Sequence, residues 1–372
     1  MEERRELVCA MRRRRSAVQE ICRRLGVSRA FAYRLSERCA VEGWSGLEPR
    51  QRGPKRWRGR RGAGYRRWIL AARQRHPHWS GWKLWHLLRR AHPRVVLPSV
   101  RTVERWLRHA GLTRRRPPRL RLRPKPLRPA RLARRSNDRW TFDWKGWRRT
   151  ADRRKVEPFT VRDDATKRLL WVLPLPDHRD ATLRRRCRQL FRRYGVPKVI
   201  RTDLGGPFCG NGPHGLTSLS AWWFDLGIAV EFVSRRSLLH NNAHEQMHGV
   251  MEQEIFQPPS ATYQAQLRRL RQWQREFNEL RPHARLGGRT PAQCYRPSPG
   301  ALPKRRPVTY PRHWPVRRVA SSGTIGLGGA IHYVSRAFAG RLVGCQPQGR
   351  CFRVHYRRLL LQVLMPQLKL PT

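Results

Sequence analysis

Acidic residues are scarce in this sequence. Asp and Glu together number 24 against 82 Lys and Arg, which gives the 372-residue chain a formal charge of +58. Only nine of the basic residues are Lys, so arginine-rich codon usage explains the preference for Arg but not the shortage of acids. A chain this basic repels itself unless a polyanion covers it. The composition therefore predicts DNA as the partner, because neutralising phosphates releases counterions and drives binding.

Other features are missing as well. The eight cysteines contain no C-x-x-C pair, which disfavours a zinc ribbon or finger. No apolar run approaches the roughly 20 residues that a membrane-spanning helix needs. The beginning of the sequence lacks the apolar stretch of a secretory signal. We therefore expect a reduced, cytoplasmic protein with no membrane contact. The length predicts two or three domains, and the 15 tryptophans argue against general disorder.

Residues 1–48 predict a helix-turn-helix. An apolar helical spacing ends at Gly26, and Ser28 can cap a following helix. A helix, a glycine turn and a capped helix form the pattern of this DNA-binding unit, although an ordinary helical hairpin reads the same way. Arg29 and Arg34 would lie on the helix that enters the major groove.

Residues 65–112 repeat the pattern. Ser99 can cap a helix that ends at Gly111, and Arg101 and Arg105 lie one turn apart on one of its faces. Residues 49–64 and 113–136 are rich in Arg with Gly or Pro, so they predict basic linkers. Base contacts by the four arginines would recognise a DNA sequence, whereas the second linker would lie along the DNA backbone.

Residues 137–299 predict an α/β core. Its predicted order is three strands, a helix, a fourth strand, a helix, a fifth strand and two helices, which indicates a mixed sheet. The predicted strands are Trp140–Trp147, Glu157–Arg162, Leu169–Leu175, Lys198–Thr202 and Ile228–Val233. The predicted helices are Ala181–Tyr194, Leu216–Leu226, Ala243–Phe256 and Tyr263–Asn278. Residues 305–372 predict a small β module, resembling a barrel, with short strands and glycine turns.

Because acids are rare, their positions are informative. Asp143 falls inside the first predicted strand, Asp203 follows the fourth, and Glu245 is expected in the first turn of a helix. Ligands of open α/β sheets gather at the carboxyl ends of strands. Carboxylate oxygens suit Mg²⁺ or Mn²⁺, and two such ions can promote an in-line displacement at phosphorus. The three residues are therefore candidate ligands.

The core resembles the catalytic core of bacterial insertion-sequence transposases of the DDE, retroviral-integrase-like type. The matching segments are Asn137–Trp140, Asp143–Trp147, Leu190–Pro197, Arg201–Asp203, Gly215–Trp223, Leu226–Ile228, His244–His248, Arg281–His283 and Gly287–Gln293. The likeness extends over nearly the whole chain. It implies a multidomain protein with helix-turn-helix units, a ribonuclease H-like α/β core with a mixed sheet, and the C-terminal β module.

The resemblance also implies a function. Asp143, Asp203 and Glu245 would bind two Mg²⁺ or Mn²⁺ ions and catalyse DNA strand cleavage and strand transfer. The partners would be element ends and target DNA, bound by a homo-oligomer near the bacterial nucleoid. His248 would flank Glu245 near a phosphate. The alternative is a decayed, non-catalytic DNA-binding relative.

Departures from the family pattern keep that alternative open. After the second Asp the family usually has Asn-Gly, whereas Leu204-Gly205 stands here. Before the Glu helix the family has a loop with Pro and Gly, whereas Ser237-Leu238 and Asn242 occupy it here. Asn242 would take the left-handed conformation of a Gly at some energetic cost. Gln246 and Ala284 replace an Arg and a Glu.

Two further interpretations concern the remaining candidates. The segment His244–His248 fits H-E-x-x-H, the zinc-protease helix, but the basic charge and the two predicted DNA-binding units favour the transposase. Asp163, Asp164, Glu252 and Glu254 are expected to be solvated or ion-paired at the surface, with Glu252 the one substitute ligand. Trp222 and Trp223 are expected in the core.

Overall fold

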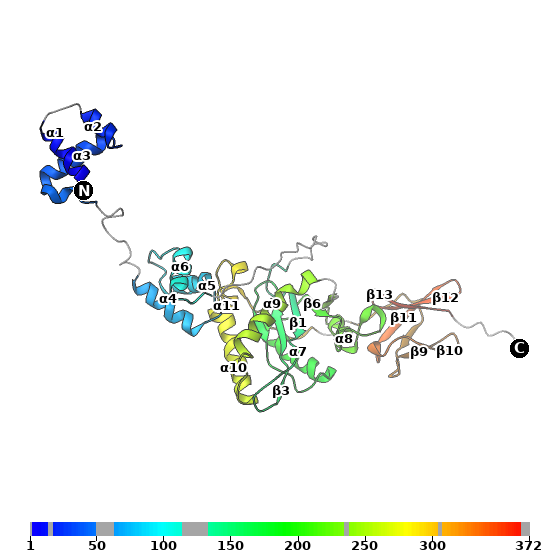
Figure 1. Ribbon diagram of the computed structural model, residues 1–372. Coiled ribbons are helices and arrows are strands. Elements are labelled where there is room, and N and C mark those ends of the chain that lie inside the picture. Colours follow the sequence, from blue (N-terminus) through cyan, green and yellow to red (C-terminus); the bar gives the residue numbers. More distant parts are fainter. Residues whose placement is uncertain are drawn as a thin grey trace. The chain divides into compact units, whose positions relative to one another are not determined.

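The computed structural model describes residues 2–13, 18–49, 63–113, 133–233, 238–303 and 307–365. The chain divides into two compact units, Met1–Ala63 and Gly64–Thr372 (Figure 1). Most of the two predicted linkers, and Ser237 of the loop before the Glu helix, lie outside the described residues. No helix in the described ranges combines the length and apolar character that a membrane crossing requires.

The first unit is helical. It contains α1 (Glu2–Arg12), α2 (Val18–Arg24), α3 (Arg29–Glu42) and the 3₁₀ helix η1 (Gly43–Leu47). Gly26 turns the chain between α2 and α3 with a φ of 62°, which favours glycine, and the Ser28 hydroxyl accepts from the Phe31 amide at 3.2 Å. The predicted turn and cap are thus confirmed. DNA recognition by this unit remains a prediction.

The second unit begins with three more helices. They are α4 (Ala63–Arg75), α5 (Gly81–Ala91) and α6 (Val100–His109). The Ser99 hydroxyl accepts from the Thr102 amide at 3.3 Å, so the predicted N-cap of α6 is confirmed. Arg90 of α5 donates to the Leu280 carbonyl at 2.8 Å, which ties these helices to the core.

A five-stranded mixed sheet forms the core, in the order β5-β4-β1-β6-β7. Its strands are β1 (Arg139–Trp144), β4 (Phe159–Asp163), β5 (Leu169–Trp171), β6 (Val199–Asp203) and β7 (Ala229–Val233). Strands β1, β6 and β7 are parallel, whereas β4 and β5 are antiparallel to their neighbours. The predicted mixed sheet is confirmed. Strand β1 ends at Trp144, three residues earlier than predicted, and Gly146 follows with a φ of 79°.

The two faces of this sheet differ because side chains alternate along each strand. One face is apolar and packs against α7 and α8; its sheet residues are Trp140, Phe142, Phe159, Val161 and Ile200. We call the opposite face the polar face; it consists of Arg139, Thr141, Asp143, Thr160, Arg162, Arg201 and Asp203. Helix α9 contributes His244 and His248 to the polar face.

The remaining elements of the core surround the sheet (Figure 1). The helices are α7 (Asp180–Tyr194), η3 (Pro213–Gly215), α8 (Ser218–Asp225), α9 (Leu238–Ile255), α10 (Tyr263–Arg275), the π-helix η4 (Glu276–Leu280), η5 (Ala284–Leu286) and α11 (Pro291–Cys294). A small hairpin joins β2 (Arg148–Arg149) to β3 (Lys155–Val156). Trp222 and Trp223 of α8 are buried in the core, as expected.

The C-terminal segment is built of short strands. They are β8 (Val316–Arg318), β9 (Thr324–Leu327), β10 (Ala330–Tyr333), β11 (Leu342–Gln348), β12 (Cys351–Tyr356) and β13 (Leu359–Leu364), with the 3₁₀ helix η6 (Arg336–Phe338). The strands pair in a sheet of order β13-β12-β11-β8 and a hairpin of β9 and β10. Asp225 of α8 pairs with Arg341 at 2.9 Å, so this segment contacts the core. Closure into a barrel remains a prediction.

Candidate metal and DNA site

Asp143 and Asp203 lie on neighbouring parallel strands. Thr141 of β1 is in register with Arg201 of β6, and Asp143 and Asp203 each follow by two residues. Both acids therefore lie on the polar face at the carboxyl ends of their strands, where parallel strands are about 4.8 Å apart. Asp203 ends β6, and its Oδ1 accepts from the Gly205 amide at 3.2 Å. The sheet itself brings these two carboxylates to one edge.

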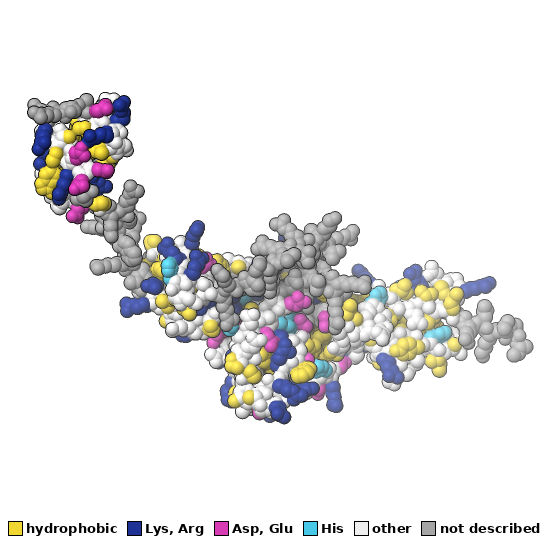
Figure 2. Space-filling view, in the orientation of Figure 1, with side chains coloured by type: hydrophobic (Ala, Val, Ile, Leu, Met, Phe, Trp, Pro, Cys, Tyr) yellow, Lys and Arg dark blue, Asp and Glu magenta, His cyan; other side chains and the backbone are white. Residues whose placement is uncertain are grey.

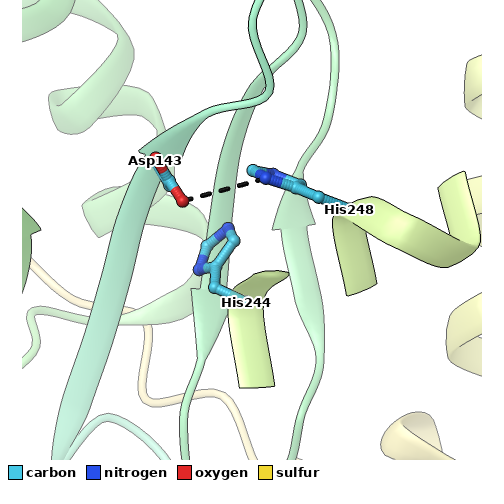
Figure 3. A group of neighbouring side chains, drawn as sticks. All are labelled: Asp143, His244 and His248. Atoms are coloured by element: carbon cyan, nitrogen blue, oxygen red, sulfur yellow. Dashed lines mark ion pairs between the residues drawn. The ribbon is translucent and has the colours of Figure 1, made fainter. Parts of the chain in front are cut away.

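Helix α9 adds two histidines beside Asp143. The Thr160 hydroxyl, directly across from Asp143 on β4, lies 2.6 Å from His244 Nε2 and 2.9 Å from His248 Nε2. His244 Nδ1 lies 3.0 Å from the Thr141 hydroxyl, and His248 Nδ1 faces Asp143 Oδ2 at 3.8 Å (Figure 3). Among the described residues, Asp143, His244 and His248 have ligand atoms that all lie within 4.8 Å of one another.

Both histidines are held neutral by their surroundings. Burial, together with the positive charges of Lys145 and Arg162, lowers the pKa of His248 to about 3. Burial also lowers the pKa of His244 well below its usual value, and His248 and Arg162 add to the effect. His248 is only 9% exposed, so it lies inside the polar face, not on the surface where a phosphate contact was expected.

Glu245 occupies a different position from the one predicted. Helix α9 begins at Leu238, so Glu245 lies two turns into the helix and not in its first turn. Its side chain is exposed, and it does not belong to the cluster of Asp143 with the two histidines. Asn242 also lies within α9, so the left-handed turn expected there is wrong. The sequence reasoning began this helix at Ala243, five residues later than Leu238.

The other acids have structural partners. Asp163 is fully buried, which corrects the expectation of a surface position; its carboxylate accepts from the amides of Asn137 and Thr166 at 2.9 and 2.8 Å. Asp164 pairs with Arg139 at 2.6 Å, as an ion-paired residue was expected to do. Glu252 pairs with Lys145 at 2.8 Å and Arg148 at 2.9 Å, and the partly buried Glu254 pairs with Arg281.

The four arginines predicted to contact DNA are all exposed. Arg29 and Arg34 lie on α3 in the first unit, and Arg101 and Arg105 lie on α6 in the second unit. Figure 2 shows Lys and Arg side chains on the visible surface of both units, with fewer acids between them. The exposure is compatible with base contacts, which themselves remain a prediction.

Part of the core is similar to a known family. Residues 226–291 match the family described as "Integrase core domain", and this segment contains Glu245 and His248. An uncharacterized 39.2 kDa protein of insertion element IS476 from Xanthomonas euvesicatoria is 27% identical over 158 residues, which are 42% of this chain and 44% of that protein. The resemblance to insertion-sequence transposases of the integrase type is confirmed.

Two further relatives are similar to the chain. An uncharacterized 31.7 kDa protein of insertion element IS407 from Burkholderia multivorans is 26% identical over 160 residues, 42% of this chain and 54% of that protein. The chain spans about half the length of these curated relatives. The HTLV-2 integrase catalytic core domain, solved in complex with magnesium, is 14% identical and covers 43% of this chain and 95% of that chain, with a TM-score of 0.32.

The geometry around His244 and His248 differs from that of a zinc-protease helix. In a zinc-protease helix, both histidines direct a nitrogen at the metal and the intervening Glu serves as the base. Here both Nε2 atoms face the Thr160 hydroxyl, and Glu245 is exposed. The spacing therefore reflects contacts between α9 and the polar face.

Proposed function

We propose that this protein is a transposase that cleaves and rejoins DNA strands, with Asp143, Asp203 and Glu245 holding two Mg²⁺ or Mn²⁺ ions. The observation that carries the proposal is the parallel pairing of β1 and β6 up to Thr141 and Arg201, because Asp143 and Asp203 each follow two residues later. The "Integrase core domain" match and the two insertion-element relatives support the same reading.

The residues present fit divalent ions. Carboxylate oxygens are the ligands that Mg²⁺ and Mn²⁺ prefer, and two of them lie on adjacent strands. Glu245 shares an edge of α9 with Glu252, because seven residues return a helix to within about 20° of the same direction. Glu252 on that edge reaches Lys145, two residues beyond Asp143. Glu245 thus lies on the side of α9 that faces the end of β1.

When bound, the ions would activate the attacking oxygen and stabilise the leaving oxygen at phosphorus. The protein's own residues supply position and charge. Asp143 and Asp203 fix the ion-binding edge on a rigid sheet, so little reorganisation is needed for the reaction. The exposed arginines of α3 and α6 bind the element ends, and the basic surface binds target DNA in a homo-oligomer.

The test is strand transfer by the full chain in Mn²⁺ on oligonucleotides that carry the inverted repeats flanking its gene. Asp143→Asn, Asp203→Asn and Glu245→Gln should each abolish cleavage and joining while DNA binding persists, since each change removes a charge but keeps the shape. Glu252→Gln is the matched control and should remain active. Near-normal transfer by any of the three variants would remove that residue from the site. DNA binding without transfer by the wild type would favour the non-catalytic alternative.

A further inference from the structure

The Thr160 hydroxyl determines which nitrogens of the two histidines carry protons. Its Oγ1 donates to the Asp143 carbonyl at 2.9 Å, because a carbonyl oxygen can only accept. A hydroxyl has one proton and two lone pairs. The same oxygen lies within hydrogen-bond distance of Nε2 of both His244 and His248. With the Thr160 proton on the Asp143 carbonyl, both rings donate an Nε2–H to Thr160.

This arrangement sets the other nitrogen of each ring. In a neutral imidazole with a proton on Nε2, Nδ1 carries a lone pair. The lone pair of His244 lies 3.0 Å from the Thr141 hydroxyl, whose single proton can go to this nitrogen instead of the Arg162 carbonyl at 3.4 Å. The lone pair of His248 faces Asp143 Oδ2 at 3.8 Å, too far for a hydrogen bond (Figure 3). His248 thus presents an electron pair toward a carboxylate oxygen.

Two electron-rich atoms that face each other are suited to a shared cation. We propose that His248 Nδ1 is a metal ligand that acts together with Asp143 Oδ2, and that Thr160 holds the ring in the tautomer that binding requires. The proposal rests on the proposed function insofar as Asp143 binds an ion there. The separation of 3.8 Å is shorter than two metal–ligand bonds of about 2.0–2.2 Å placed end to end, so one ion can contact both atoms.

The surroundings of His248 match those of metal-binding histidines. Such a histidine donates its second N–H to a fixed acceptor, which orients the ring. Thr160 is that acceptor here, and its own proton is held by the Asp143 carbonyl. His244 differs because both of its nitrogens are already engaged. An imidazole ligand favours transition metals over Mg²⁺, so the site should prefer Mn²⁺ or Zn²⁺ to Mg²⁺.

The tautomer and the ligand can be tested in the unmodified full chain. The ¹⁵N spectrum of histidine-labelled protein is recorded without metal and then with Zn²⁺ alone, and the His248 signals among the 14 histidines are assigned from their loss in His248→Gln. We expect an Nε2–H tautomer without metal and a large shift of His248 Nδ1 on addition of Zn²⁺. A proton on Nδ1, or no response of that nitrogen to saturating Zn²⁺, would overturn the proposal.

Affinity measurements give a second readout. Titration calorimetry with Mn²⁺ alone should show an affinity loss of about 10-fold to 100-fold for His248→Gln and for Thr160→Val, the range typical when a supporting group of a metal site is lost. Thr160→Ser keeps the hydroxyl and is the matched control, with an affinity within about twofold of the wild type. Unchanged Mn²⁺ affinity in folded His248→Gln would also contradict the proposal.

These measurements separate the inference from the proposed function. If strand transfer occurs but His248 does not respond to Zn²⁺, the inference fails and the transposase proposal stands. If His248 responds to Zn²⁺ but the wild-type chain joins no DNA, the metal site stands and the proposed activity fails. If His248→Gln does not fold, the His248 signals are assigned instead from their loss in His248→Asn, and the wild-type spectra then decide.

Discussion

The two faces of the core sheet are formed by the same strands, but one face is packed with apolar side chains and the other carries the polar groups of the candidate site. On the apolar face, Phe142 and Phe159 lie at most 2% exposed among other aromatic rings. On the polar face, Asp143 and Thr160 alternate with them and contact the histidines of α9. Adjacent residues of a strand point to opposite faces of the sheet. One of them is therefore buried among apolar side chains while the next can hold a metal ion. A rigid, well-packed face thus holds the chemical groups of the other face in position.

The apolar face should carry most of the stability. Phe142→Ala removes a ring that makes edge contacts with Phe159 and Trp223 at centroid distances of 5.7 and 5.3 Å. We expect a loss of about 3–5 kcal/mol in the free energy of unfolding, measured by urea denaturation. Trp147→Ala is the control, because Trp147 is 51% exposed and should cost far less. Equal losses in the two variants would contradict the division between the faces.

The amino-terminal end of β1 holds a charge cluster whose effect depends on pH. Asp164 lies against Arg139 at 2.6 Å and Lys167 at 3.1 Å. Burial raises the pKa of Asp164, but Lys167, Arg139 and Arg162 outweigh it and hold that pKa well below its usual range. Asp164→Asn removes the carboxylate nearest to Arg139 and Lys167, while Glu231 stays 3.5 Å from Arg139. We expect a loss of about 3 kcal/mol near pH 7, because breaking a buried ion pair leaves its charge less compensated.

The sign of the pH effect follows from the lowered pKa. A depressed carboxyl pKa contributes stability that is fully present above the unfolded-state value, about 3.9, and is lost as pH falls through the folded-state value. The difference between wild type and Asp164→Asn should therefore stay constant from pH 7 to about 5 and shrink below about 4. Urea denaturation across this range measures it. A difference that grew on acidification would refute the assignment.

The sequence contains a signal for these faces where apolar and polar residues alternate strictly. Strand β1 alternates Trp140, Phe142 and Trp144 with Thr141 and Asp143, so its two sides can be read directly. The caps at Ser28 and Ser99 were also predictable, because Ser precedes an apolar helical pattern at each. Strand faces and helix caps can therefore be predicted from the sequence, because each depends on the residues of a single strand or helix.

The sequence could not predict how α9 packs on the sheet. The spacing of His244 and His248 indicates that they share a helix face, but not that this face meets Thr160. Glu245 is exposed because the phase of the helix, set by tertiary packing, turns its neighbours inward. Asp163 had a usable signal: Thr166 three residues later closes a turn with its carboxylate at 2.7 Å.

The arginines that are predicted to contact DNA are exposed, unlike the residues on the two faces of the core sheet. If Arg34 and Arg101 read bases, Arg34→Ala and Arg101→Ala should each weaken binding to true element ends by about 1–3 kcal/mol and leave binding to random DNA nearly unchanged. Fluorescence anisotropy at fixed salt measures this in the full chain. Arg185, exposed on α7 of the core, provides the control Arg185→Ala. Equal weakening on both DNAs would indicate phosphate contacts instead.

The smallest effects are expected at the departures from the family pattern. Leu204 is 52% exposed directly after Asp203, and Leu204→Asn should raise strand transfer modestly, because Asn stabilises turns by bonding to the backbone. Asn242→Gly should lower thermal stability by a few tenths of a kcal/mol, since Gly is a poorer helix former and Asn242 lies in α9. If Asn242→Gly instead gained stability, the result would support the left-handed turn that the sequence predicted at position 242.

The central claim is that Asp143 and Asp203 on the polar face bind the divalent ions. Titration calorimetry with Mn²⁺ on the full chain, without DNA, tests it most directly in Asp143→Asn, Asp203→Asn and Glu252→Gln. The account predicts at least about a tenfold loss of affinity, or roughly 1.4 kcal/mol, for each Asp variant. It predicts no loss for Glu252→Gln, whose carboxylate is engaged by Lys145 and Arg148. Wild-type affinity in both Asp variants, or a loss confined to Glu252→Gln, would contradict it.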